Sequence, residues 1–182
     1  FVSKSIVKYA AVILFIFGFY SIYYYFIVSD QYNKEEKRIE YTVHANPPGK
    51  KTKYKLPDGS VVFLNSSSSI EYVKTFNGEE RKVHLKGEAY FEVAENIEKP
   101  FIVVSNGITT TALGTIFNIN AYPGYEIVRV SLLEGKVEIQ NPIDGGLPIL
   151  LLPGKELHVN SKQNTYTEKS FNTASVVGWK EG

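Results

Sequence analysis

The adjacent pair Gly114-Thr115 has the most specific chemical potential in this sequence. A threonine carries its hydroxyl beside its own peptide bond, so the Thr115 hydroxyl is placed to attack the Gly114 carbonyl and give an ester that water opens. Strain in the backbone at that bond would favour the attack. The alternative interpretation is structural, with Gly114 needed for a bend and Thr115 beginning a strand. The pair is therefore a candidate site of single-turnover self-cleavage.

The other polar residues form no catalytic or metal-binding pattern. The three histidines are far apart and have no metal-type spacing such as His-x-x-x-His; they are His44, His84 and His158. Three carboxylates have the chemistry of general acids or bases, but their contexts are a turn and a strand start, which favours structural roles; they are Asp58, Glu88 and Glu92. We therefore expect no ordinary enzyme, no metal site and no cofactor.

The composition of the chain excludes further classes of function. Lys and Arg total 20 and Asp and Glu total 19 among 182 residues, which gives a net charge of +1. That balance offers no strongly basic face, so we expect no nucleic-acid partner. The absence of Cys excludes a disulfide framework, a thiolate metal site and a cysteine nucleophile. Because the sequence begins at Phe1 and contains no Met, we expect it to be a piece of a longer protein.

An uncharged apolar run covers residues 9–28. A helix of about 20 residues spans about 30 Å, the thickness of a bilayer's hydrocarbon core. Three tyrosines, at 23–25, lie toward one end of the run, where an aromatic belt is placed. The run is too long for a signal peptide and lacks a small-residue cleavage site, and it has no amphipathic period that would favour a buried core helix. We therefore predict a membrane-spanning helix, although the basic flanking residues do not decide its orientation.

The pattern changes at Tyr41, where short apolar alternations begin and are separated by Gly, Pro, Asn and Asp. A period of two predicts strands with one buried and one solvent-facing side. The predicted strands are 41–45, 51–56, 61–64, 69–73, 81–85, 88–94, 101–105, 108–113, 115–121, 126–133, 135–140, 149–152 and 155–160. Many short, closely spaced strands predict an all-β domain, either a sandwich or a solenoid-like stack.

Alternation also predicts the core of this domain. The expected core residues are Leu64, Val83, Leu85, Phe91, Val93, Ile102, Val104, Phe117, Ile119, Val130, Leu132, Val137 and Ile139. His84 lies between two of them and is expected on the solvent-facing side. The segment Leu56-Pro57-Asp58-Gly59-Ser60 has the chemistry of a tight hairpin connection, and Asn77-Gly78 is a second hairpin signal.

Six blocks of this sequence together resemble FecR-type anti-sigma regulators. Residues 56–66, Leu-Pro-Asp-Gly-Ser-Val-Val-Phe-Leu-Asn-Ser, resemble the family's LPDGS-V-LN motif, and residues 85–93, Leu-Lys-Gly-Glu-Ala-Tyr-Phe-Glu-Val, resemble its L-GEA-F-V strand. Residues 99–101, 113–118, 133–137 and 152–156 resemble four further blocks in the family's order. The resemblance covers about residues 41–159, and six blocks in order are a specific match.

The resemblance implies a membrane-spanning regulator with its N-terminus in the cytoplasm and its β domain in the periplasm, held in the inner membrane by a single span. It implies an extracytoplasmic-function sigma factor as partner of a domain before Phe1. It also implies the signalling domain of a TonB-dependent outer-membrane transporter as partner of a domain that begins near Trp179, and site-specific proteases that release the cytoplasmic part. Some members of the family self-cleave at the Gly-Thr that corresponds to Gly114-Thr115.

These observations divide the chain into five segments. We expect a cytoplasmic flank at 1–8, a transmembrane helix at 9–28, a linker at 29–40, the β domain at 41–160 and a second linker at 161–182 that leads toward a further domain. A different class of function stays open at this point, namely a membrane-tethered module that senses or adheres to carbohydrate. Its support is the aromatic loop Ala121-Tyr122-Pro123-Gly124-Tyr125, in which the two tyrosines are expected to be exposed.

Overall fold

The structure is a computed structural model that describes residues 4–32, 40–140, 147–160, 162–163 and 165–181. The chain divides into two compact units, Phe1–Ile39 and Glu40–Gly182. The first unit contains helix α1, Lys4–Tyr32. The expected linker at 29–40 falls largely on residues 33–39, which lie outside the described residues.

The side chains of α1 that the structure describes, residues 13–27, are exposed on every side of the helix. Large apolar groups dominate this surface, and Leu14, Phe15 and Tyr25 are each more than 70% exposed. Within the described residues, the structure contains no helix with both the length and the apolarity required to cross a membrane. The predicted span at 9–28 extends beyond the described side chains and stays a prediction.

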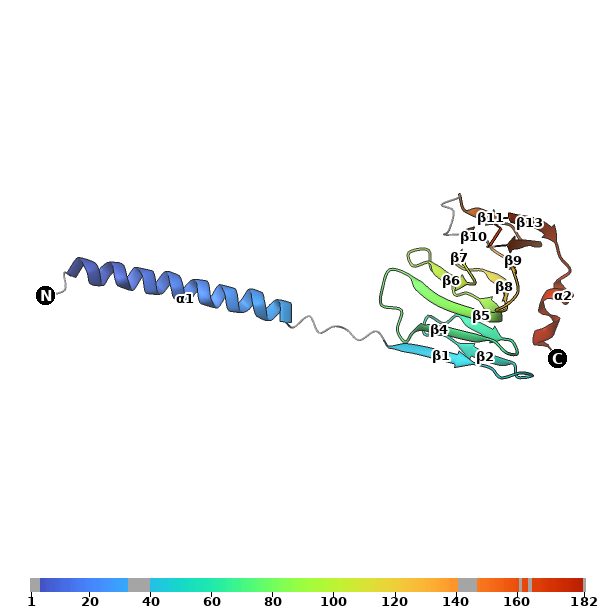
Figure 1. Cartoon of the computed structure of the whole chain (residues 1–182), viewed down its shortest axis with the longest axis horizontal. Helices are drawn as coiled ribbons and strands as arrows, with labels where there is room; N and C mark the ends of the chain where they lie inside the picture. The colour runs from blue at the N-terminus through green and yellow to red at the C-terminus, as the bar shows by residue number, and fades with distance from the viewer. Residues whose placement is uncertain (1–3, 33–39, 141–146, 161, 164, 182) are drawn as a thin grey trace. The chain divides into compact units, whose positions relative to one another are not determined.

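The second unit is built from a curled antiparallel sheet with one parallel pair, β5 with β6 (Figure 1). Its strands are β1 Tyr41–Ala45, β2 Thr52–Lys55, β3 Val61–Leu64, β4 Ser69–Val73, β5 Arg81–Glu92, β6 Phe101–Ser105, β7 Ile108–Ala112, β8 Ile116–Ala121, β9 Ile127–Glu134, β10 Val137–Gln140, β11 Ile149–Leu151, β12 Lys155–Asn160 and β13 Thr165–Ser170. The predicted all-β domain is confirmed, and most of the predicted strand limits agree within two residues.

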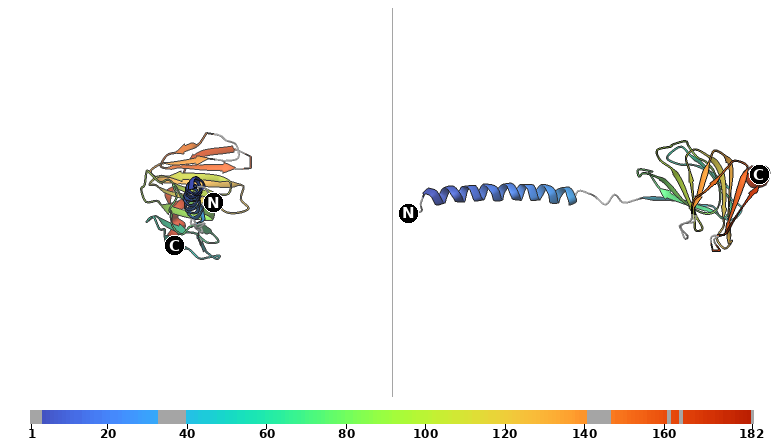
Figure 2. Two further views of the ribbon diagram at one scale, coloured as in Figure 1. Left: turned by 90° about the vertical axis from the view of Figure 1, so that its left-hand side faces the viewer. Right: turned by 90° about the horizontal axis from the view of Figure 1, so that it is seen from above.

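Strand β5 belongs to both halves of the sheet. Its first part pairs with β4 and β6, and its second part pairs with β3 and β8. From β5 one path continues through β6, β7 and β10 to β11, and the other continues through β8, β9 and β12 to β13. The two paths approach each other again where β11, the end of the first, contacts β12, the next-to-last strand of the second, so the sheet curls around its core (Figures 1 and 2).

The change of partners along β5 occurs at Gly87. This residue has φ +93°, and a Cβ added to it would lie 2.3 Å from Ser68 Oγ. Only glycine fits both that backbone conformation and that close approach. The sequence predicts a break between two strands here, whereas the structure has one continuous strand that bends at the glycine.

The core lies between the two halves of the sheet and is made of alternating apolar side chains. Of the predicted core residues, Ile102 and Val104 are wrong, because both are only half-buried while their neighbours Phe101 and Val103 are fully buried. All the residues of the run 101–104 are apolar, so alternation alone cannot choose a face. The parallel register with β5 decides, since it pairs Val103 with the buried Val83. His84 is exposed, as predicted.

The segment expected as a second linker contains regular structure. Strand β13 pairs with β12, and it is followed by the short helix α2, Thr173–Val177, and a 3₁₀ turn, Gly178–Lys180. Every residue of β13 is exposed, so it shows no apolar alternation that sequence reasoning could detect. The 3₁₀ turn lies against the sheet, because Lys180 Nζ is 3.8 Å from the ring centre of Tyr90.

Candidate functional site

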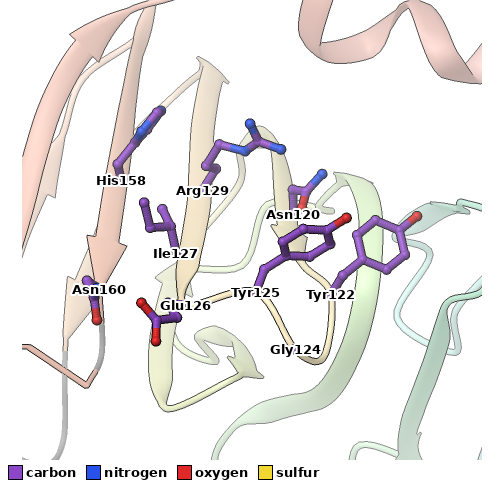
Figure 3. A pocket seen from close by; sticks show the side chains of 9 residues that line it. All are labelled: Asn120, Tyr122, Gly124, Tyr125, Glu126, Ile127, Arg129, His158 and Asn160. Carbon is purple, nitrogen blue, oxygen red and sulfur yellow. The ribbon is translucent and has the colours of Figure 1, made fainter.

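A pocket of about 720 Å³ lies on the outer face of strands β8, β9 and β12 (Figure 3). We call it the tyrosine pocket, and its lining residues are Asn120, Tyr122, Gly124, Tyr125, Glu126, Ile127, Arg129, His158 and Asn160. Strand pairing brings the central side chains together, because Asn120 is opposite Arg129 and Arg129 is opposite His158. Directly opposed residues share a face of a sheet. The next residues on either side of Arg129, Val128 and Val130, point into the core.

One wall of the pocket is a tight turn after β8. The Tyr125 N–H donates to the Tyr122 carbonyl over 3.2 Å, with Pro123 second and Gly124, at φ +92°, third in the turn. That combination defines a type II turn. It holds the rings of Tyr122 and Tyr125 edge to face, with centres 6.4 Å apart. The aromatic loop expected from the sequence is therefore preformed beside a pocket.

The two tyrosines differ in environment. Tyr122 is half-buried, and its hydroxyl donates a hydrogen bond of 2.8 Å to the Ser66 carbonyl. Burial is the main cause that raises the pKa of Tyr122 above its ordinary value. Tyr125 is 68% exposed and lines the pocket (Figure 3). Tyr122 thus anchors the turn, whereas Tyr125 is available for contact.

The charges in and around the pocket largely cancel. His158 Nε2 is 2.5 Å from Glu156 Oε1, and the other oxygen of Glu156 accepts a 2.5 Å hydrogen bond from Ser131. At the rim, Glu126 lies 3.6 Å from Lys162. The main chain of Arg129 is paired in the sheet, but its guanidinium makes no hydrogen bond or ion pair with any residue that the structure describes. The guanidinium therefore keeps its donors for a ligand or for water.

The Gly114-Thr115 pair lies elsewhere, immediately before β8. Thr115 is buried, and its hydroxyl has no hydrogen-bond partner among the described residues. The bond is tightly enclosed, since a Cβ added to Gly135 would lie 2.9 Å from the Gly114 oxygen, and one added to Gly114 would lie 2.9 Å from Glu95. Neither Gly114 nor Thr115 has a positive φ, so that kind of backbone strain is absent.

The histidines do not converge. His44 stacks on Tyr54 with ring centres 4.0 Å apart and bonds to the Tyr72 hydroxyl at 3.1 Å. His84 is exposed on β5 and His158 is on β12. Among the described residues, no group of three potential metal ligands occurs.

Two of the three carboxylates considered as acids or bases, Asp58 and Glu88, have structural partners, and Glu92 is half-buried at the end of β5. Asp58 pairs with the buried Arg81 at 2.8 Å, and Glu88 accepts from Asn65 at 2.8 Å and from Asn118 at 3.0 Å. Sequence reasoning missed Arg81, because a charged residue at the start of a strand is usually exposed. It also missed Arg129 and His158 as pocket residues, because only the pairing of distant strands brings them beside the tyrosines.

Comparison with known proteins is consistent with this fold. A family model described as "FecR protein" matches residues 42–138. Two crystal structures of a protein from Parabacteroides distasonis, provisionally described as an anti-sigma factor, superpose with TM-scores of 0.73 and 0.72, each at 33% sequence identity. They cover 79% and 78% of this chain, which in turn spans 66% and 65% of theirs. No curated protein matches the chain in a sequence search.

Proposed function

Since this chain belongs to the FecR family, we propose that it is part of a protein that regulates a sigma factor. The observation that carries the proposal is the family match over residues 42–138, joined to solved relatives described as anti-sigma factors. The family is regulatory and non-enzymatic. In the test, the gene is deleted and transcripts from promoters of the cognate sigma factor are counted. A changed transcript level that the intact gene restores supports the proposal, and unchanged transcripts contradict it.

We further propose that residues 9–28 anchor the β domain in the inner membrane. The uncharged run, the helical conformation of Lys4–Tyr32 and the exposed apolar side chains of residues 13–27 support this proposal. Such a surface is costly in water and favourable in a bilayer. Reporter fusions after residue 40 are expected to be active as alkaline phosphatase and inactive as a cytoplasmic reporter. The opposite pattern would place the β domain in the cytoplasm.

The finer steps of the relay are a further proposal, which the resemblance to the family supports. We propose that the sigma factor is of the extracytoplasmic-function class and that the signal arrives from a TonB-dependent outer-membrane transporter. Proteolysis then releases the cytoplasmic part. Deletion of the transporter's periplasmic signalling domain is expected to remove induction while leaving transport intact. Induction that persists after this deletion would separate the regulator from the transporter.

A separate proposal concerns maturation of the β domain. The buried, unpartnered hydroxyl of Thr115 favours self-cleavage at Gly114-Thr115, because it has no competing hydrogen bond to give up. Its oxygen would attack the Gly114 carbonyl carbon as the Gly114–Thr115 C–N bond breaks and the Thr115 nitrogen takes up a proton. Water then opens the ester, leaving a Gly114 carboxylate and a free Thr115 hydroxyl.

The test is the denatured mass of the purified protein. Two fragments whose masses sum to the intact chain plus one water support self-cleavage, provided that Thr115→Ala gives a single band. Thr115→Ser keeps the nucleophile and is expected to cleave. A wild-type protein that stays intact through prolonged incubation leaves Thr115 with a structural role alone.

A further inference from the structure

The tyrosine pocket has the form of a preorganised ligand site. Its volume of about 720 Å³ lies within the range of roughly 300–1,000 Å³ that small-molecule sites occupy. The turn that carries Tyr125 is fixed by Pro123, by Gly124 and by the hydrogen bond from Tyr122 to Ser66. A site that is already ordered loses little conformational entropy when a ligand binds.

The lining of the pocket restricts the class of ligand. The lining carries both the positive charge of Arg129 and the negative charge of Glu126, which lies 3.6 Å from Lys162 at the rim, and His158 is held by Glu156. A polyanion would therefore meet both signs of charge. Ile127 and the two tyrosine rings give the lining apolar surface, but the amides, the guanidinium, the imidazole and the carboxylate that share it would lose hydrogen-bond partners against a purely apolar ligand.

A neutral saccharide satisfies both parts of this surface. The exposed ring of Tyr125 offers a flat apolar face for the C–H groups of a sugar ring. Arg129 supplies only donors, whereas the amide of Asn120 both donates and accepts, which matches hydroxyl groups that also do both. Asn120 and Arg129 are directly opposed on β8 and β9, and both line the same pocket as Tyr125 (Figure 3), so one ligand can contact all three.

We propose that the tyrosine pocket binds a neutral saccharide, with Tyr125 stacking on the sugar and with Arg129 and Asn120 bonding to its hydroxyls. This ligand would give the β domain an input of its own, in addition to the signal proposed to come from a transporter. The inference does not depend on sigma-factor regulation, since it concerns only the surface of strands β8, β9 and β12.

The test is direct binding of defined oligosaccharides to the full chain. The chain is kept in a detergent without a sugar headgroup and is titrated with hexasaccharides of α-1,4-glucan, β-1,4-glucan, β-1,3-glucan, mannan and chitin. An oligogalacturonate serves as the anionic probe. Calorimetry and intrinsic fluorescence are the readouts. Saturable binding of at least one neutral hexasaccharide is expected.

Variants locate the site. Tyr125→Ala and Arg129→Met are each expected to weaken binding by about tenfold or more, with circular dichroism unchanged because both side chains are exposed. Tyr166→Ala is the matched control, since Tyr166 is 62% exposed on β13 and does not line the pocket. The proposal is overturned if no neutral probe binds, if only the anionic probe binds, or if both pocket variants bind as the wild type does.

Discussion

Replacement of Arg81 by methionine is expected to destabilise the β domain more than any surface charge change. Arg81 is 1% exposed at the start of β5. Its Nη1 donates to Asp58 Oδ2 and to the Ala94 carbonyl, and its Nε donates to the Lys99 carbonyl, all at 2.8 Å. One guanidinium therefore joins the turn between β2 and β3 to the end of β5 and the approach to β6.

The size of the destabilisation follows from the groups that Arg81→Met leaves without a partner. In Arg81→Met, the Asp58 carboxylate keeps its bonds from Ser60 but loses its charged partner, and two backbone carbonyls lose their donor. Breaking one side of a buried ion pair costs about 3–5 kcal/mol. In the double variant Asp58→Asn/Arg81→Met neither charge remains. Its loss in free energy of unfolding is therefore expected to be smaller, by about 0.5–3 kcal/mol, than the sum of the losses in the two single variants.

Urea unfolding of residues 40–182, followed by circular dichroism, measures these losses. With an m-value of about 2 kcal/mol/M, Arg81→Met is expected to lower the midpoint by about 1.5–2.5 M. Arg81→Lys keeps the charge but not the planar fork of donors, and an intermediate midpoint is expected. Lys74→Met is the control, because its ion pair with Glu40 is 66% and 65% exposed, and an unchanged midpoint is expected.

Two results would refute this reasoning. A loss below about 1 kcal/mol in Arg81→Met would mean that the pair does not contribute more than an exposed one. Strict additivity in the double variant would mean that Asp58 and Arg81 act independently, despite the 2.8 Å contact between them.

Three further predictions concern the core, alkaline pH and Thr115. Phe117→Ala is expected to cost about 3–5 kcal/mol in the same unfolding assay, because Phe117 is fully buried and stacks on Phe91 with ring centres 5.0 Å apart. Burial raises the pKa of Tyr72 and of Tyr122 in the folded chain, so these tyrosines ionise first in the unfolded chain. Their contribution to stability is expected to be fully present below pH about 10 and to be lost as the pH rises above it. Urea midpoints measured across that range check the fall, and combining Tyr72→Phe with Tyr122→Phe is expected to reduce it. Thr115→Val is expected to stay a single band without losing β structure, whereas cleavage in this variant would implicate a protease.

Most of the fold was predictable because it depends on a local pattern. Strand β12 alternates apolar and polar residues, and β3 is a short apolar run bounded by turn residues. The limits of both strands agree with the predicted ranges. Strand β13 was missed because each of its residues is exposed. The buried face of β6 was predicted wrongly, because its consecutive apolar residues fit either face of the sheet. Only the long-range pairing register with β5 determines which residues face the core.

The residues of the candidate site were likewise predictable only where they have a local sequence signal. The aromatic turn was predicted from Tyr122 and Tyr125, because Pro and Gly between them indicate a turn. The expected exposure is correct for Tyr125 and wrong for Tyr122, which is half-buried because its hydroxyl bonds to Ser66. Arg129 and His158 were not predicted, since each reads only as the solvent-facing member of a strand. They become neighbours through the pairing of β9 with β12, which are separated in sequence by β10 and β11. A property that depends on the order of strands in a sheet has no local signal.

The motif residues identify the family, whereas residues outside the motifs are expected to give this member its ligand specificity. In the LPDGS block, Asp58 and Ser60 bond to each other and to Arg81 and Ala94. In the GEA block, Gly87 permits the bend of β5, and Glu88 holds Asn65 and Asn118. Both blocks therefore stabilise the fold, and a match to them identifies the architecture without naming a ligand. Tyr125 and Arg129 lie outside those blocks on an open face of the same sheet, so they can change between relatives at little cost to folding. Specificity for a ligand is thus expected to reside in the loop and strand residues that the family motifs leave unspecified.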